Sequence, residues 1–305
     1  MPSSQARIIL PPEGTVATGG SRMVRIAGDY RVWTKKVGDA PVKVLLLHGG
    51  PGGDHQYFEC FEDYLPQNGI EFYYYDQLDS TNSDKPGDPS LWTVERFRDE
   101  VEQVRQCLGL ENFYLYGQSW GGMLAIEYAL EYQEHLAGLI VSNMAASIPS
   151  YVESIERLRA QLPPAVNAVL DKYESAGHYD APEYLEVLIG EVYQRHLCRL
   201  KPWPEPLERC FRSMNSKIYN YMQGPSEFTV TGTFKDWDRW RDLPRIRVRT
   251  LVMGARYDTM AESDIRREAD LIPNSTLFLS ENGSHLTFWD DQRPYMEALI
   301  RFLKG

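Results

Sequence analysis

Cysteine is scarce in this sequence, with four residues among 305. None belongs to a C-x-x-C pair, and no histidine stands at zinc-finger spacing from them, so neither a disulfide scaffold nor a zinc finger is indicated. We therefore expect free thiols in a reducing compartment, and hence a cytoplasmic protein. None of the four is expected to be a nucleophile, because a serine in a better context is present. The four are Cys60, Cys107, Cys198 and Cys210.

Long apolar runs are also missing, since no stretch reaches the 18 or so uncharged residues that a membrane helix needs. Residues 1–14 lack the apolar core and cleavage site of a signal peptide. Basic residues are outnumbered, with 32 Lys and Arg against 43 Asp and Glu, a net charge of −11. Nucleic-acid binders usually carry a basic face, so the sequence predicts neither a nucleic-acid nor a membrane partner. Hydrophobic residues at 43% indicate a folded protein.

Short runs rich in Val, Ile, Leu, Tyr and Phe alternate with longer helical patterns, which is typical of a mostly parallel α/β sheet. Two early runs, 23–26 and 30–36, predict an antiparallel hairpin at one edge. Apolar residues at helical spacing predict helices over 94–108, 122–131 and 293–303. The remaining predicted strands are 42–47, 70–75, 113–116, 139–142, 250–253 and 276–279.

The strand rhythm stops after Asn143 and resumes near Thr250. The intervening stretch has helical periodicity, many prolines and many aromatic residues, and a loop of this length would be abnormal. We therefore expect a core formed by residues 1–146 and 241–305, with a helical cap of residues 147–240 inserted into it.

A G-x-S-x-G motif, Gly-Gln-Ser-Trp-Gly at 117–121, lies between a predicted strand and a predicted helix. The turn there must be tight to expose the serine hydroxyl, and the flanking glycines leave room for the two backbones. The alternative is a glycine-rich turn with an inert serine. The strand–turn–helix context favours Ser119 as a nucleophile.

A serine nucleophile needs a base, and in this kind of fold the chain order is Ser, then Asp or Glu, then His. Four histidines follow Ser119, but only His285 comes after a late predicted strand. Its neighbours Gly283 and Ser284 suit a loop that leaves the sheet. The other three, which we expect to be surface or packing residues, are His135, His178 and His196.

The acid that orients the base is expected to be Asp258, which follows the predicted strand 250–253. Parallel α/β sheets place their sites at the carboxyl ends of strands. Asp264 and Asp270 are rivals, but they lie in the helical pattern that follows. The alternative for Asp258 is a helix cap or an ordinary loop residue.

The run His-Gly-Gly-Pro-Gly-Gly at 48–53 follows the predicted strand 42–47. Acyl transfer needs two backbone N–H donors for the developing oxyanion. One is expected from Trp120, directly after the nucleophile, and the other from this glycine-rich loop. A phosphate-binding loop is the rival interpretation, but neither G-x-G-x-x-G nor a Walker A lysine is present.

Together these motifs resemble the prolyl iminopeptidase (prolyl aminopeptidase) branch of the α/β-hydrolases, over nearly the whole chain. Two further segments resemble that family: Tyr-Asp-Gln at 75–77 and His-Leu-Thr-Phe-Trp at 285–289. A third, Met-Gln-Gly-Pro-Ser-Glu-Phe at 222–228, looks like the cap of the tricorn-interacting aminopeptidase. The resemblance implies an α/β-hydrolase fold, a mostly parallel sheet with a helical cap. It implies that the N–H of Gly50 is the second oxyanion donor, that Glu227 binds the substrate's α-amine, and that Gly49 lines the substrate. No metal or organic cofactor is implied.

Two departures from that family's pattern stand out. After Asp-Gln the family usually shows D-Q-x-G-x-G, whereas Asp79 and Thr81 occupy the glycine places here, which bears on the loop shape. Relatives commonly carry a Glu just after the triad Asp, and here that residue is Thr259. One carboxylate fewer is expected to weaken amine recognition or to shift preference toward other small amides or esters.

The sequence therefore predicts a serine hydrolase that releases an N-terminal residue, preferably proline, from short peptides or amino-acid amides. The first alternative is an L-amino-acid amidase or carboxylesterase without strict proline preference. The second is a ligand-binding relative without catalysis, which the complete set of Ser119, Asp258 and His285 disfavours. Dehalogenase or epoxide-hydrolase chemistry would place Asp at the position of Ser119. The oligomeric state is left open.

Overall fold

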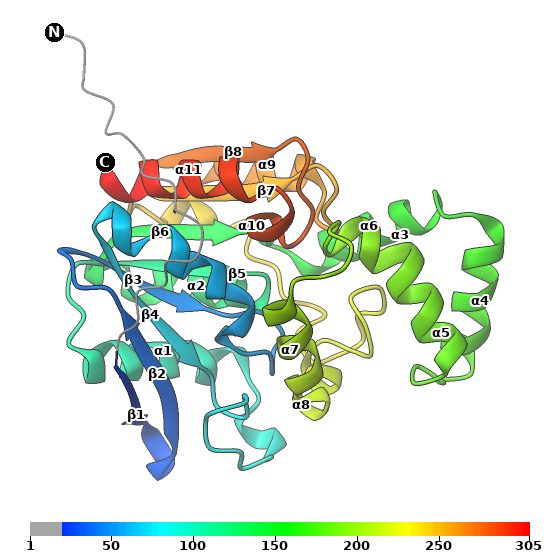
Figure 1. The fold of residues 1–305 in the computed structure, drawn as a ribbon, viewed down its shortest axis with the longest axis horizontal. Coiled ribbons are helices and arrows are strands. Elements are labelled where there is room, and N and C mark those ends of the chain that lie inside the picture. The colour runs from blue at the N-terminus through cyan, green and yellow to red at the C-terminus, as the bar shows by residue number, and fades with distance from the viewer. Residues whose placement is uncertain (1–19) are drawn as a thin grey trace, which may run out of the picture.

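The computed structural model describes residues 20–305, and a mixed sheet runs through the middle of this part of the chain (Figure 1). Eight strands pair in the order β1-β2-β4-β3-β5-β6-β7-β8. β1 and β2 form the antiparallel hairpin predicted at one edge, β2 also pairs antiparallel with β4, and all other pairs are parallel. The strands are β1 Ser21–Arg25, β2 Arg31–Val37, β3 Val42–Leu47, β4 Ile70–Asp76, β5 Phe113–Gln118, β6 Leu136–Ser142, β7 Thr250–Ala255 and β8 Ser275–Ser280.

The predicted strands and the α/β-hydrolase fold class are confirmed, although most strands are longer than the apolar runs. β5 continues to Gln118 and β7 to Ala255, so they end next to the motifs that follow them. Helices cover both faces of β5, which explains its nearly continuous apolar sequence. Phe113 packs edge-on against Tyr128 of α2, whereas the Tyr116 hydroxyl meets that of Tyr295 on α11 at 2.5 Å.

The helices predicted beside the sheet are present. α1 spans Val94–Leu108 as predicted, because the Thr93 side chain caps its first turn and Gly109, at φ 65°, ends it. The other helices are α2 Trp120–Tyr132, α3 Ile148–Arg159, α4 Pro164–Ser175, α5 Pro182–Val187, α6 Gln194–His196, α7 Glu205–Ser213, α8 Ser216–Met222, α9 Glu262–Leu271, α10 Thr287–Asp290 and α11 Gln292–Lys304.

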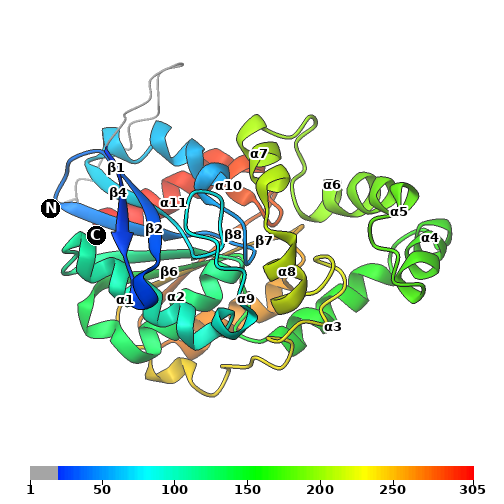
Figure 2. The same ribbon diagram turned by 90° about the horizontal axis from the view of Figure 1, so that it is seen from below.

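Between β6 and β7 the chain is largely helical and adds no strand to the described sheet. Helices α3, α4, α5 and α7 each have proline in the first turn, where a missing N–H costs nothing. In both views α4 and α5 lie farthest from the sheet, and α7 and α8 lie between them and the strands (Figures 1 and 2). The division into a 1–146 and 241–305 core and a 147–240 cap stays a prediction.

All four cysteines lie in the described part of the chain and are free, as predicted. A search of residues 20–305 finds no helix with the length and apolar character to cross a bilayer.

Candidate active site

Ser119 lies in a sharp turn between β5 and α2, at φ 56° and ψ −127°. A positive φ is uncommon for a residue with a side chain, and it marks local backbone strain. The flanking glycines permit this turn. A Cβ on Gly117 would lie 2.0 Å from the carbonyl oxygen of Gly121, and a Cβ on Gly121 would lie 2.0 Å from that of Leu47. The strand–turn–helix context expected around Ser119 is therefore present.

The structure brings the predicted acid and base together. Asp258 follows β7 and His285 follows β8, and Oδ1 of Asp258 lies 2.8 Å from Nδ1 of His285. Both residues are buried. Burial alone would lower the pKa of His285, but the charge and the hydrogen bond of Asp258 outweigh burial, so the pKa is raised from its usual value.

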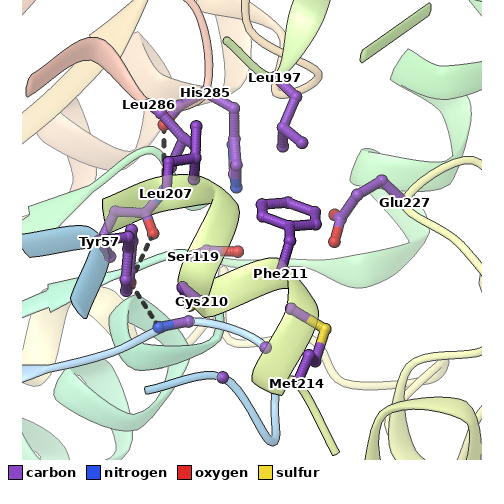
Figure 3. A pocket seen from close by; sticks show the side chains of 14 residues that line it. Tyr57, Ser119, Leu197, Leu207, Cys210, Phe211, Met214, Glu227, His285 and Leu286 are labelled. Carbon is purple, nitrogen blue, oxygen red and sulfur yellow. Dashed lines mark hydrogen bonds between the residues drawn. The ribbon is translucent and has the colours of Figure 1, made fainter. Parts of the chain in front are cut away.

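Ser119 and His285 line the same pocket, about 400 Å³ in volume, here called the His285 pocket. Figure 3 shows the Ser119 hydroxyl and the His285 ring pointing into it. Gly49, Gly50 and Glu227 also line this pocket. The structure thus gathers the predicted serine, base, glycine loop and amine-binding carboxylate around one cavity.

Asn143, at the end of β6, is a site residue that the sequence analysis missed. Its Nδ2 lies 2.7 Å from Oδ2 of Asp258 and 3.2 Å from the carbonyl oxygen of Ser284. It is buried and holds a positive φ of 51°, which asparagine tolerates better than most residues. Asn143 therefore fixes the second carboxylate oxygen of Asp258. Its position directly after a central strand was the available signal.

Gly50 and Trp120, which are expected to supply the oxyanion donors, line a second, smaller cavity together with Ser119. Trp120 is the first residue of α2, so its N–H has no intrahelical partner. Gly50 holds φ 119°, and a Cβ there would lie 2.7 Å from the Gly53 nitrogen, so glycine is required. The Gly49 N–H, in contrast, donates to the Tyr57 hydroxyl at 2.6 Å. Gly49 contributes a wall of the pocket, and its own N–H is occupied.

Gln77 connects the glycine loop to the serine turn. Its side-chain Oε1 accepts from Nε1 of Trp120 at 2.8 Å, and its Nε2 donates to the His48 carbonyl at 3.0 Å. Its backbone N–H donates to Nε2 of His48 at 3.0 Å. Burial lowers the pKa of His48, which suits a neutral ring that accepts at Nε2 and donates from Nδ1 to the Gly49 carbonyl at 2.8 Å.

A second link runs from the glycine loop to His285. The Tyr57 hydroxyl, which receives the Gly49 N–H, donates to Oε1 of Gln118 at 3.0 Å. Nε2 of Gln118 then donates to the carbonyl oxygen of His285 at 3.0 Å. These contacts tie the loop, the end of β5 and the His285 segment into one hydrogen-bonded frame.

The residues that depart from the family pattern are accommodated by hydrogen bonds. Asp79 adopts φ 67°, a conformation that favours glycine, and its carboxylate accepts from Nε1 of Trp92 at 2.8 Å and from the Gly87 N–H at 2.9 Å. The Thr81 hydroxyl donates to Asp54 at 2.6 Å. Asp79 therefore keeps the left-handed backbone that glycine would adopt there.

Glu227 is half-buried in the inserted stretch and is held by tyrosines. Oε1 accepts from the Tyr219 hydroxyl at 2.6 Å, and the Tyr151 hydroxyl is shared between the Glu227 backbone carbonyl oxygen at 2.6 Å and Oε2 at 3.1 Å. Its backbone N–H donates to the Tyr193 hydroxyl at 3.1 Å. The hydroxyl of Thr259, in the place of the second acid, donates to Oδ1 of Asp258 at 3.2 Å.

A smaller cavity of about 270 Å³, the inner cavity, is lined by both Ser119 and Glu227. The rest of its wall is mainly apolar. The Trp120 and Phe234 rings stack in this wall, with 5.7 Å between their centroids. Its apolar lining residues are Trp120, Met123, Met144, Ile148, Phe234 and Met260.

The other candidates lie outside these cavities. His178 is exposed, and Asp264 and Asp270 lie in α9 as expected. His196 is a packing residue beside the site, since its Nδ1 lies 2.9 Å from the Tyr257 carbonyl oxygen. Within residues 20–305 no three His, Cys, Asp or Glu side chains are grouped so that they could hold a metal ion.

Comparison with known proteins places the chain among relatives of similar length. The family model for the alpha/beta hydrolase fold matches residues 43–292. The proline iminopeptidase of Elizabethkingia meningoseptica is 47% identical, and the match covers 91% of this chain and 95% of that protein. The proline iminopeptidase of Saccharolobus solfataricus is 38% identical, and the match covers 94% of this chain and 92% of that protein.

Two solved structures are also similar. The crystal structure of VinJ matches with a TM-score of 0.90 and 35% identity, covering 94% of this chain and 99% of that one. The proline iminopeptidase of Mycobacterium smegmatis matches with a TM-score of 0.85 and 33% identity, covering 93% and 98%. The chain belongs to the proline iminopeptidase family of α/β-hydrolases.

Proposed function

We propose that this protein is a serine aminopeptidase that releases the N-terminal residue, preferably proline, from short peptides or amino-acid amides. The observation that carries the proposal is that Ser119 and Glu227 line one small, otherwise mainly apolar cavity. A nucleophile and a carboxylate on the wall of one small cavity suit a substrate whose free ammonium and scissile carbonyl belong to the same residue, joined through a single Cα.

The catalytic steps follow from the buried acid–base pair. Ser119 attacks the carbonyl carbon and transfers its proton to Nε2 of His285, while Asp258 holds Nδ1 and stabilises the imidazolium. The N–H groups of Trp120 and Gly50 hold the oxyanion. His285 then protonates the leaving nitrogen, and water hydrolyses the acyl-enzyme by the same route.

Recognition of the substrate amine falls to Glu227. A substrate with a free N-terminus carries a positive charge, and a charge-assisted hydrogen bond to a carboxylate is stronger than a neutral one. The Tyr219 hydroxyl holds Oε1, and the Tyr151 hydroxyl bridges the backbone carbonyl and Oε2 of Glu227, so little side-chain freedom is lost on binding. Gly49 forms part of the wall beside Ser119.

The preference for proline is assigned to the inner cavity. Its volume of about 270 Å³ and its thioether and aromatic wall fit a small apolar ring better than a long or charged side chain. The similarity of the chain to the proline iminopeptidases of Elizabethkingia and Mycobacterium points the same way. Free thiols at all four cysteines of the described chain support a cytoplasmic location.

The alternative is an amino-acid amidase or carboxylesterase with the same machinery. Thr259 favours this alternative, because it stands where relatives commonly carry a second acid and leaves Glu227 as the acid expected to hold the amine. The Thr259 hydroxyl donates to Asp258.

A substrate panel tests the proposal: prolyl, alanyl and leucyl 4-nitroanilides, prolinamide, N-acetylprolyl 4-nitroanilide and 4-nitrophenyl acetate. We expect the free prolyl compounds to have the highest kcat/KM and the N-acetyl compound to be a poor substrate. Equal rates for prolyl and leucyl compounds would favour the amidase, and ester hydrolysis alone would favour the esterase.

A further inference from the structure

The two cavities that meet at Ser119 share Gly50, Ser119 and Glu227, and among the residues that distinguish them His285 decides their roles. His285 lines the His285 pocket, whereas it is not among the residues that line the inner cavity. The leaving nitrogen must receive its proton from His285. On the proposed function, the N-terminal residue occupies the inner cavity, and the leaving group therefore begins in the His285 pocket.

Beyond the reacting groups and Glu227, the wall of the His285 pocket is mainly apolar, and its polar side chains are those of Tyr57 and Gln118. Leu207, Phe211 and Met214 come from α7 and the residue just after it, at the spacing of one helix face. Leu197 and Leu286 also line the pocket, and the Leu286 N–H donates to the Leu197 carbonyl at 2.9 Å, which joins the inserted stretch to the His285 segment.

Phe211 lines this pocket together with a second, wider cleft. Figure 3 shows its ring in the pocket, with Ser119 and His285 on one side and Glu227 on the other. The wider cleft has a volume of about 1010 Å³, and much of its wall comes from α5 and the helical segment Leu188–Tyr193 that follows it. Phe211 and Met214 therefore belong to the walls of both cavities.

We propose that the His285 pocket is a specificity site for the residue that follows the N-terminal one, and that it takes an apolar side chain. The proposal rests on the proposed function and adds the second residue of the substrate to it. A leucine side chain would bury its carbons against Leu207, Phe211 and Leu286, and each buried methylene favours binding. A polar side chain would lose water there, and the polar groups of Tyr57 and Gln118 are already hydrogen-bonded to each other and to the His285 carbonyl.

Charge points to the same class of substrate. The side-chain carboxylate that lines the pocket is that of Glu227, which the substrate amine engages. An acidic second residue would lie near that carboxylate in a pocket with an apolar wall, and both repulsion and desolvation oppose its binding.

The test uses the wild-type protein and three substrates that differ only in the leaving amine: prolyl-leucinamide, prolyl-asparaginamide and prolyl-glycinamide, with prolinamide as reference. Leucine and asparagine branch at the same carbon, so shape is nearly matched while polarity differs. We expect kcat/KM for the leucine compound to exceed that for the asparagine compound at least tenfold. Leucinamide should also inhibit prolyl anilide hydrolysis more strongly than asparaginamide.

The variant Phe211→Ala removes one wall of the pocket and should reduce the leucine-to-asparagine ratio several-fold. Leu200→Ala, at an exposed residue in the same stretch, is the matched control and should keep the ratio. Hydrolysis of prolinamide with equal rates for the leucine, asparagine and glycine compounds would overturn this inference and leave the proposed function standing. Failure to hydrolyse any prolyl compound would overturn the proposed function itself.

Discussion

The hydroxyl of Tyr219 on α8 donates a 2.6 Å hydrogen bond to Oε1 of Glu227. Burial is the main cause that raises the pKa of Tyr219 well above its usual value, and the charge of Glu227 adds to it. The phenol therefore keeps its proton and remains a donor. Tyr151 of α3 approaches the other oxygen. The proposed amine-binding group is thus held by two helices of the inserted stretch.

Replacing that donor should weaken amine binding without touching the reacting atoms. For Tyr219→Phe we expect kcat/KM for prolyl 4-nitroanilide to fall about tenfold, since a hydrogen bond to a charged group contributes about 1.5–3 kcal/mol. The loss should appear mainly in KM, measured by steady-state kinetics. An equal loss for 4-nitrophenyl acetate, which has no amine, would instead indicate a general structural effect.

Glu227→Gln tests the carboxylate directly. We expect kcat/KM for free-amine substrates to fall by about 1.5–3 kcal/mol, while ester hydrolysis changes little. If both substrate classes lose activity equally, Glu227 has a structural role. If neither class loses activity, the amine binds elsewhere.

Ser119→Ala should abolish turnover and preserve the fold, since the turn is built by the glycines around it. Loss of a triad serine cost about 10⁶-fold in kcat in subtilisin. Rates with prolyl 4-nitroanilide and labelling by a fluorophosphonate probe provide the measurement, with circular dichroism as the control for folding. Retention of a tenth of the activity, with contamination excluded, would remove Ser119 from the mechanism.

Activity should fall on the acid side as His285 gains a proton, because the base must be neutral to accept the serine proton. Asp258 raises the pKa of His285, so the fall in kcat/KM should be centred above the ordinary value of about 6.5. Asp258→Asn removes the charge that raises the pKa, and should shift the midpoint down while lowering the rate. A profile that is flat from pH 5 to 8 would contradict the role of His285.

Asp79 should contribute to stability through its carboxylate, since its left-handed backbone is unfavourable for most side chains. Asp79→Ala would keep the strain and leave the Trp92 and Gly87 donors without their acceptor, so the free energy of unfolding should fall by about 2 kcal/mol or more. Asp79→Gly relieves the strain and should cost less. Urea titration ranks the three proteins, and an alanine variant as stable as wild type would refute this account.

Much of the fold followed from apolar periodicity. The boundaries of α1 were readable because Thr93 and Gly109 are local signals. Strand ends were less readable, because β5 and β7 continue into polar or small residues that are buried by neighbouring segments. Periodicity reports which face is buried and carries little information on where pairing stops.

The positions of Ser119, Asp258 and His285 at strand ends were readable from motif order. Asn143 was missed, and the Tyr-Asp-Gln motif was noted without the role of Gln77, because both roles depend on hydrogen bonds to residues far away in sequence, such as the link from Gln77 to Trp120. Such contacts leave no periodic pattern. They emerge once the strands are assembled and their carboxyl ends meet at one edge of the sheet.

The contacts of Asn143 have a consequence for the time at which the protein becomes active. Its amide reaches Asp258 and Ser284, which follow it by 115 and 141 residues. Long-range contacts of this kind form late, after local helices have appeared. During synthesis the nascent chain has Ser119 long before the ribosome reaches His285. On the proposed mechanism, the growing protein therefore cannot hydrolyse amides until the segment that carries His285 has been made and has joined the sheet.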